Sequence, residues 1–382
     1  MNRKILFVLI ALCVGAGMFA MRFGRDLPIP FAGNSKLCPT LKEIPFGEDT
    51  GLIKRVTRIS IEGIKAAYCP SFVRDEKGLF LVFRHDEKQR KEIFGIKTLF
   101  RGKIPFGSVL KMPYRTYISS VRLNEQFQPI SKPKRVFTGS DFSEDPRVFK
   151  MEDQVYLVYN DIERNDMESR TIHLAKLDPE TLKISDHVNL DLNFRRIEKN
   201  WAPFVYEEKG EKKIHFGYYF NPHVILKMND PTQSELIHLR QPNHIAVQRM
   251  PWKQSFGIVR GGTPPILVDG QYLAFFHSFF QESGKIWYVM GAYTFEAAPP
   301  FRITGCSPQP IQFKGIYDTK TCNTAFSKKP NIFPAGAILA QEDGRDVIHV
   351  SCGENDSAIK VITFDKEALL ASLAPVPYLK KK

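Results

Sequence analysis

Two adjacent acids and an arginine surround a proline in the stretch Glu144-Asp-Pro-Arg147, directly ahead of a strand-like run that begins at Val148. A carboxylate held beside a cation is a group that can give or take a proton during a reaction. Proline fixes its own backbone and disfavours helix for the preceding residue, so we expect Asp145 to be extended. Asp and Pro are also common in turns, so the competing interpretation is that this stretch only forms a turn. The rest of the chain helps to decide between the two.

Five proline-centred segments recur along the chain, and a short aromatic-rich strand follows each of them. The segments centre on Pro70, Pro146, Pro203, Pro265 and Pro334. A long internal repeat of strands and turns predicts units that must stack, because none can bury its faces alone. Radial closure leaves only short, protected edges, so the sequence predicts an all-β fold, a five-bladed β-propeller. A two-sheet sandwich or separate β domains would not explain the recurrent spacing from proline to aromatic strand.

The predicted domain boundaries follow from composition. They are residues 1–25 for a hydrophobic signal peptide or signal-anchor, 26–65 for a linker and N-terminal extension, 66–372 for the propeller, and 373–382 for a basic tail. The uncharged run from Ile5 to Met21 follows Arg3 and Lys4, which is the pattern of a secretory signal or an anchor. We therefore expect an exported or membrane-anchored protein of the envelope or secretory pathway, with membrane association through residues 5–21 if the segment is retained.

Charge and cysteine usage exclude several function classes. The formal net charge of +13 is spread along the chain. No zinc finger, aromatic RNA-binding signature or basic helix accompanies it, so we predict no nucleic-acid partner. The histidines lack metal-binding spacing, and we predict no metal and no cofactor. Cys306 and Cys322 could form one disulfide in an oxidising compartment, but isolated buried thiols are the preferred interpretation.

In a propeller, the segments that lead into the innermost strands converge at one mouth of the central channel. We expect the proline-centred segments to bring polar and charged side chains and one aromatic ring together there. These residues are Ser71, Glu144, Asp145, Arg147, Lys199, Asn200, Trp201, Arg260 and Thr263. An aromatic ring among converging hydrogen-bonding groups is typical of a sugar site, although any polar ligand could use it.

Five landmarks, in order, resemble those of a known family. They are Glu144-Asp-Pro-Arg147, Lys199-Asn-Trp-Ala-Pro-Phe204, Asn221-Pro-His223, Gly261-Gly-Thr-Pro-Pro265 and Gly353-Glu-Asn-Asp356. Over roughly residues 66–365 the chain resembles the β-mannoside phosphorylases and β-1,2-mannosidases of glycoside hydrolase family 130, and the related propeller-type β-mannosyltransferases. The resemblance implies a five-bladed propeller with its site over the central funnel.

The resemblance also implies roles for individual residues. Asp145 would be the general acid, relaying a proton through a mannose hydroxyl, and inorganic phosphate, as a co-substrate, would attack the anomeric carbon with inversion. Phosphorolysis needs a cluster of cations, whereas inverting hydrolysis needs a second carboxylate. The candidates for substrate or phosphate binding are Arg84, Glu144, Arg147, Arg170, Lys199, Asn200, Trp201, His223, Arg260, His277 and Asp356. Trp201 could equally be core packing, and His223 and His277 could be satisfied core histidines.

The expected function is therefore that of a carbohydrate-active enzyme acting on an oligosaccharide or glycan of the β-mannoside type by an inverting mechanism. Hydrolysis, phosphorolysis and glycosyl transfer all remain open. Export would favour hydrolysis or transfer onto an envelope glycan, because a sugar phosphate product is hard to retain outside the cell. The alternative from another class is a catalytically silent propeller that binds glycan or a protein partner through the same mouth.

Overall fold

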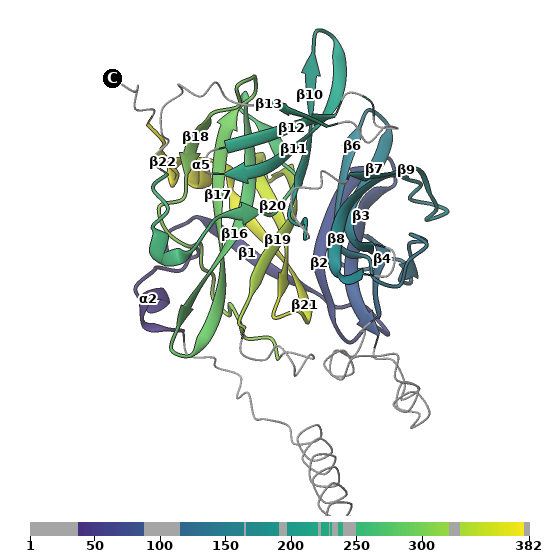
Figure 1. The fold of residues 1–382 in the computed structure, drawn as a ribbon. Coiled ribbons are helices and arrows are strands. Elements are labelled where there is room, and N and C mark those ends of the chain that lie inside the picture. Colours follow the sequence, from purple (N-terminus) through teal and green to yellow (C-terminus); the bar gives the residue numbers. More distant parts are fainter. Residues whose placement is uncertain are drawn as a thin grey trace, which may run out of the picture. The chain divides into compact units, whose positions relative to one another are not determined.

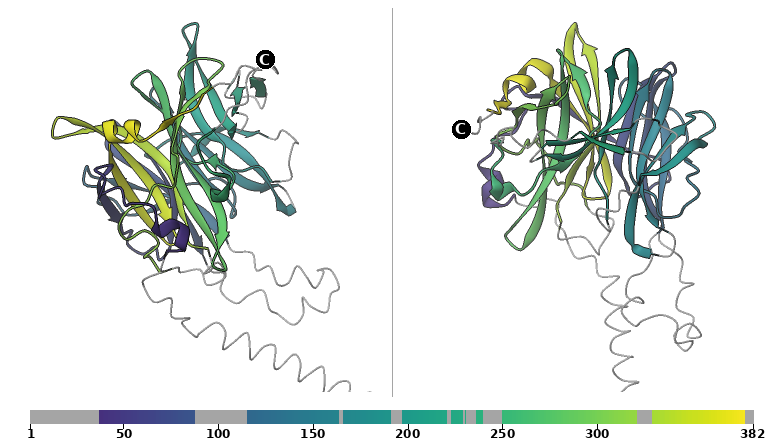
Figure 2. Two further views of the ribbon diagram at one scale, coloured as in Figure 1. Left: turned by 90° about the vertical axis from the view of Figure 1, so that its left-hand side faces the viewer. Right: turned by 45° about the horizontal axis from the view of Figure 1, so that its top comes forward.

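Five antiparallel sheets stand side by side around a common centre in the computed structural model (Figures 1 and 2). The structure describes residues 37–87, 115–163, 166–190, 197–220, 223–228, 230, 236–239, 250–320 and 329–377. The predicted all-β, five-bladed propeller is confirmed. The predicted signal or anchor, including residues 5–21, lies outside the described residues. Within the described part of the chain, no helix is both long enough and apolar enough to cross a bilayer.

In the described part of the chain, each of the first three blades contains four strands. The first blade holds β2 (Ala67–Asp75), β3 (Gly78–Glu87), β4 (Arg115–Leu123) and β5 (Lys134–Arg135). The second holds β6 (Glu144–Met151), β7 (Gln154–Glu163), β8 (Asp166–Leu177) and β9 (Ile184–Leu190). The third holds β10 (Ala202–Glu208), β11 (Glu211–Phe220), β12 (His223–Met228) and β13 (Leu236–Leu239).

The last two blades carry the two ends of the described chain. The fourth contains β14 (Arg260–Gly261), β15 (Ile266–Val268), β16 (Gln271–Glu282), β17 (Lys285–Glu296), β18 (Ile303–Cys306) and the late strand β22 (Ala374–Pro375). The fifth contains β19 (Ile332–Glu342), β20 (Arg345–Glu354), β21 (Ala358–Asp365) and the early strand β1 (Ile53–Ile59). The helical elements of the described residues are the short α2 (Pro39–Lys42), η1 (Gln254–Phe256) and α5 (Lys366–Ala371).

Strand β1 corrects the predicted domain boundary. The sequence placed residues 53–59 in the linker, but they pair antiparallel with β21 and form the outermost strand of the fifth blade. The propeller is thus closed by strands from both ends of the described chain. The outward side chains of β1 include Lys54, Arg55 and Arg58, and charged side chains protect an edge strand from unwanted pairing.

Tight turns explain why the hairpins have a common register. Four hairpins are joined by two residues that both have positive φ, which is the geometry of a type I′ turn. These loops are Lys209-Gly210, Asp269-Gly270, Ser283-Gly284 and Asp343-Gly344. Between the turns the middle strands are buried on both faces, as in β20, so their sequences read as nearly continuous apolar runs.

The proline-centred segments are themselves the innermost strands. The sequence analysis treated them as segments leading into those strands, but β2, β6, β10 and β19 each contain one of the prolines and contact one another around the centre. The ladder is irregular at Pro70, Pro146 and Pro334, where the register shifts. Proline cannot donate to a ladder, so a bulge is where a strand tolerates it.

The cysteines of the described residues are buried free thiols. They are Cys38, Cys69, Cys306 and Cys352. Cys322, the suggested partner of Cys306, lies outside the described residues.

Candidate functional site

The bulge in β6 aims Asp145 at the centre of the propeller. The expectation of an extended backbone is wrong, because Asp145 has φ 52, in the left-handed region. Such a conformation is costly for a non-glycine residue, by about 1–3 kcal/mol, and is maintained only where the surroundings impose it. Cys69, which precedes the bulge proline of β2, has the same conformation with φ 47. Two neighbouring inner strands thus turn equivalent residues in the same way.

Glu144 is the hub of an ion-pair network that joins three blades. Arg170 donates to its Oε1 at 2.7 Å, and Arg84 reaches the same oxygen at 3.0 Å. Lys199 Nζ donates to Oε2 at 3.0 Å. The three cations come from β8, β3 and the segment before β10, while Glu144 itself is buried at the start of β6. The network fixes cations from different blades around one carboxylate.

Asp145 lies beside this hub and is held as an anion. Arg84 Nη1 donates to its Oδ1 at 3.3 Å, and Asn160 Nδ2 donates to its Oδ2 at 3.3 Å. Burial alone would raise the pKa of Asp145, but Arg84, Lys199 and Arg147 together hold that pKa well below its usual range. These cations therefore favour the ionised form of the carboxyl at this position.

Arg147 ties the blades together across the centre and is only 2% exposed. Its Nε donates to the carbonyl of Gly262 in the fourth blade at 2.5 Å. Its Nη1 donates to the carbonyls of Asp145 at 2.9 Å and Pro146 at 3.1 Å. Arg147 therefore holds the backbone of Asp145 through Nε and Nη1 and adds positive charge, while its buried Nη2 has no hydrogen-bond partner among the described residues.

Asp356 approaches the same mouth from the turn between β20 and β21. Its Oδ1 accepts a hydrogen bond from Asn331 Nδ2 at 2.9 Å. Burial raises the pKa of Asp356; Arg84 opposes this rise, while Asp145 and Asp86 add to it by repulsion. Two carboxylates in one mouth, Asp145 and Asp356, thus have pKa values displaced in opposite directions.

Lys199 and Arg260 are the cations of this group that solvent reaches most easily. The Lys199 side chain is 33% exposed, and Arg260 is exposed at the start of the fourth blade. Asn200, next to Lys199, has φ 66, and its carbonyl packs against Gly261, where a Cβ would lie 2.0 Å from that oxygen. His277 pairs with Arg260 across the sheet. Burial, with Arg147 and Arg260, lowers the pKa of His277 to about 3, so His277 is neutral.

The structure places Trp201 and His223 away from the mouth. Trp201 is 2% exposed, stacks edge-on against Phe216, and donates from Nε1 to Glu198 at 3.2 Å. His223 is 1% exposed, and its Nδ1 bonds the carbonyl of Phe301 at 2.7 Å among aromatic rings. Neither side chain offers a surface to a ligand in this structure.

Ser71 and Thr263 are also turned to the backbone. Ser71 Oγ accepts from Val148 N at 3.0 Å, which ties the first blade to the second, and Thr263 Oγ1 accepts from Phe275 N at 3.0 Å. Both side chains therefore stabilise the backbone that forms the mouth.

Replacement of Trp201 by alanine should destabilise the protein by about 3–5 kcal/mol, because a large buried side chain leaves a cavity. Urea unfolding measures the change, and Trp201→Phe, which keeps most of the packing, should cost much less. Loss of sugar affinity with unchanged unfolding free energy would contradict the core placement.

Sequence reasoning missed Asn160, Asp86 and Asn331. Asn160 lies four residues beyond Tyr156 in the second strand of its blade, the same offset as Arg84 from Phe80 in the first blade. That offset was a signal in the repeat, because equivalent positions at the mouth end of the second strands face the same centre. Asp86 accepts from Tyr68 at 2.7 Å and has a neighbour in Arg84 at 3.4 Å.

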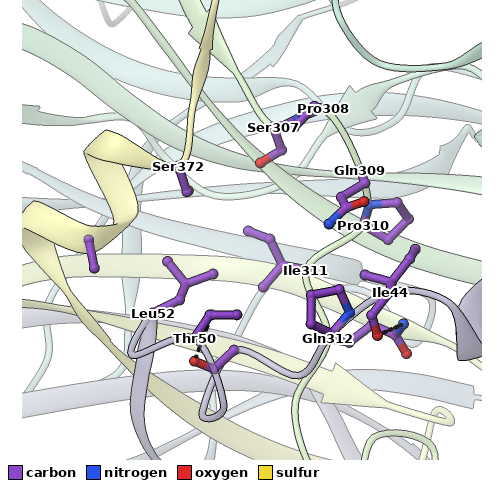
Figure 3. Close-up of a pocket in the computed structure, with 13 residues that line it drawn as sticks. Ile44, Thr50, Leu52, Ser307, Pro308, Gln309, Pro310, Ile311, Gln312 and Ser372 are labelled. Carbon is purple, nitrogen blue, oxygen red and sulfur yellow. Dashed lines mark hydrogen bonds between the residues drawn. The ribbon is translucent and has the colours of Figure 1, made fainter.

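Several pockets of the described residues lie outside this mouth, two of them beside the core of the propeller. A pocket of about 230 Å³ lies between the segment around Ile44, the loop at Pro310 and the end of α5 at Ser372 (Figure 3). An apolar pocket of about 440 Å³ is lined by segments of all five innermost strands, including Val148 and Ile338. Neither contains a predicted site residue.

No family model and no curated protein matches the chain. Solved structures share its fold at low sequence identity. β-1,2-Mannobiose phosphorylase from Listeria innocua, in complex with β-1,2-mannobiose, is 17% identical with a TM-score of 0.57, covering 86% of this chain and 98% of its own. A mannose phosphorylase from Leishmania mexicana, in complex with a phosphate ion, is 12% identical with a TM-score of 0.51, covering 87% and 95%. A glycosyl hydrolase from Bacteroides ovatus is 13% identical with a TM-score of 0.52, covering 82% and 87%.

Proposed function

We propose that this protein is a carbohydrate-active enzyme that acts on β-mannoside-type glycans by inverting displacement at the anomeric carbon. Asp145 is the proton-transfer group, donating to the glycosidic oxygen when that bond is cleaved. The observation that carries the proposal is the position of Asp145, whose backbone is held at φ 52 in a bulge and whose carboxylate accepts hydrogen bonds from Arg84 and Asn160. Arg147 and Lys199 add positive charge beside it. The likeness in fold to mannoside phosphorylases supports the substrate class.

The charges favour a reaction that involves an anion. An anion bound at Lys199 and Arg260 would offset the cations that keep Asp145 ionised, and would raise its pKa toward the range in which it can donate. Phosphate supplies such an anion as a co-substrate, and a phosphate-bearing glycosyl donor does the same. Hydrolysis would instead require a second carboxylate about 6.5–9.5 Å from the first to activate water. Asp356 is the carboxylate at the mouth that such a reaction would use.

Product analysis tests the proposal. The full-length protein is incubated with β-mannosides with and without phosphate. Mannose 1-phosphate formed only in the presence of phosphate indicates phosphorolysis, and free mannose in both samples indicates hydrolysis. No cleavage, and no transfer from mannose 1-phosphate or a nucleotide sugar, would reject the enzyme and leave a propeller that binds glycan or a protein partner.

The location of the reaction is part of the proposal. The uncharged run 5–21 after Arg3 and Lys4 supports an exported or membrane-anchored enzyme that meets its glycan in the envelope or secretory pathway.

A further inference from the structure

The first described residues pack on the mouth side of the fourth blade. Strand β16 leaves the turn at Asp269-Gly270 and runs toward the mouth, where His277 pairs with Arg260. It continues beyond that pair to Glu282. Thr40 in α2 donates to Glu282 at 3.1 Å, and α2 lies beside the lower end of the β16–β17 hairpin in Figure 1. The chain therefore joins the propeller at the end where the mouth opens.

The sequence before this point sets how far the mouth side can lie from a membrane. Residues 22–36 connect the uncharged run 5–21 to the start of the propeller. A chain of that length spans at most about 50 Å, even when fully extended. If the run 5–21 is retained in a bilayer, as the proposed location allows, α2 and the mouth-side end of the fourth blade stay close to the membrane surface.

Exposed apolar and basic side chains flank the mouth on the third and fourth blades. Ile197, which precedes β10, is 51% exposed, and Ile258, which precedes β14, is 67% exposed. The guanidinium carbon of Arg260 lies 5.1 Å from the ring centroid of the partly exposed Phe279. These residues and two lysines form the mouth rim, which consists of Ile197, Lys199, Lys253, Ile258, Arg260 and Phe279.

The chemistry of the mouth rim fits an anionic bilayer. Exposed apolar side chains enter the boundary between lipid headgroups and acyl chains, and Lys and Arg beside them attract anionic lipid. Lys253 starts η1, which is tied to β16 because Ser278 donates to the carbonyl of Phe256 at 2.7 Å. This cation is therefore held at the same end of β16 as Phe279.

The opposite face of the propeller also exposes apolar side chains, but its turns carry the wrong charge. Leu267 is 58% exposed and Leu339 is 43% exposed, both at the apolar pocket of about 440 Å³. The turns between the two inner strands of the five blades lie on this face and have a net charge of −3. Their charged residues are Glu76, Lys77, Glu152, Asp153, Lys209, Asp269 and Asp343. Anionic lipid would be repelled there, so charge favours the mouth side.

We propose that the mouth rim docks on an anionic bilayer, so that the mouth opens toward the membrane and takes a glycan carried by a membrane lipid. The sugar chain extends from the bilayer surface toward Asp145, while its lipid stays in the bilayer. This inference rests on the proposed function and location, and it adds the surface that the protein binds and the carrier of its substrate.

Quenching of tryptophan fluorescence by brominated phosphatidylcholine maps the docked face without turnover. The full-length protein is reconstituted in vesicles of phosphatidylcholine and phosphatidylglycerol at about three to one. Ile197→Trp and Ile258→Trp place a new indole on the mouth rim, and Leu267→Trp and Leu339→Trp are the matched controls on the opposite face. The chain's own tryptophans are buried and give all four variants the same background.

We expect quenching in the two rim variants only. It should weaken when phosphatidylglycerol is omitted or when salt is raised to about 0.5 M, because salt screens the attraction. Equal quenching of the controls would place the opposite face on the bilayer and overturn the inference. Quenching of none of the four variants, or a protein that does not float with the vesicles, would overturn it as well.

The carrier of the glycan is tested with one disaccharide in two forms. Octadecyl β-mannobioside is supplied in the same vesicles and methyl β-mannobioside in solution, in the reaction that product analysis identifies. Ile258→Asp should lower the ratio of the first rate to the second by about tenfold, because it removes an apolar side chain from the bilayer. Leu267→Asp is the control and should leave the ratio unchanged.

The outcomes separate this inference from the proposed function. An unchanged ratio in Ile258→Asp, with activity on both glycosides, overturns the inference and leaves the proposed function standing. Quenching confined to the mouth rim, with no activity on either glycoside, supports the docking and rejects the proposed function.

Discussion

Asp145→Asn should lower kcat for the proposed β-mannoside reaction by about 10²–10⁴-fold, because an amide can neither give nor take the proton that the proposed mechanism passes through Asp145. The change is nearly isosteric, and the amide can still accept a bond from Arg84. Affinity for oligosaccharide should largely persist, since Asp356 and the scaffold of the mouth remain. Steady-state kinetics and calorimetric titration of β-mannobiose separate the two effects.

Asp141→Asn is the control, and it should leave kcat unchanged. Unaltered turnover by Asp145→Asn would show that Asp145 transfers no proton. A loss of affinity that accounts for the whole loss of activity would make it a binding residue only.

Glu354→Ala should destabilise the protein by about 3–5 kcal/mol, because it leaves the buried ammonium of Lys360 without its counter-ion. Glu354 is 0% exposed. It accepts from Lys360 Nζ at 2.8 Å and from Tyr317 N at 2.6 Å, and also from the Thr319 hydroxyl. The same turn positions Asp356, so activity should fall together with stability. Urea unfolding at neutral pH measures the free energy.

Two further variants test whether the loss of stability in Glu354→Ala comes from the buried ion pair. Glu342→Ala removes a partly exposed carboxylate that pairs with the exposed Arg55, and an ion pair at the surface is worth about 0–1 kcal/mol. The double variant Glu354→Leu with Lys360→Met removes both buried charges and should be more stable than Glu354→Ala. If Glu354→Ala costs no more than Glu342→Ala, the buried pair does not hold this turn.

The blades were predictable because their signals are local. Each proline, glycine turn and aromatic strand lies within one hairpin, and the repeat of that pattern gave the blade number. Strand β1 carries no such signal, since its partner β21 lies at the other end of the chain, with Ile59 opposite Ile359. Pairing over that separation is decided by closure of the ring, so a linker was the natural interpretation.

The sequence indicated which residue types the candidate site contains, but it predicted only in part which way their side chains point. Asp145, Glu144, Arg84 and Lys199 lie together in the structure. Trp201 has a side chain suited to a sugar face, but it points into the space between blades, and sequence alone does not say which way a strand-end residue points. The backbone of Asp145 was misjudged because the rule for residues before proline is local, and the bulge and Arg147 override it.

Because the fifth blade needs both β1 and β21, it can be completed only late in the synthesis of the chain. Strand β1 is made early, yet its partner β21 follows only after the first four blades. At ordinary rates of translation that delay is on the order of tens of seconds. Throughout it, Lys54, Arg55 and Arg58 keep an unpaired edge charged and soluble. The last blade is thus completed by the first strand of the described residues, and a chain interrupted before β21 would leave β1 without a partner.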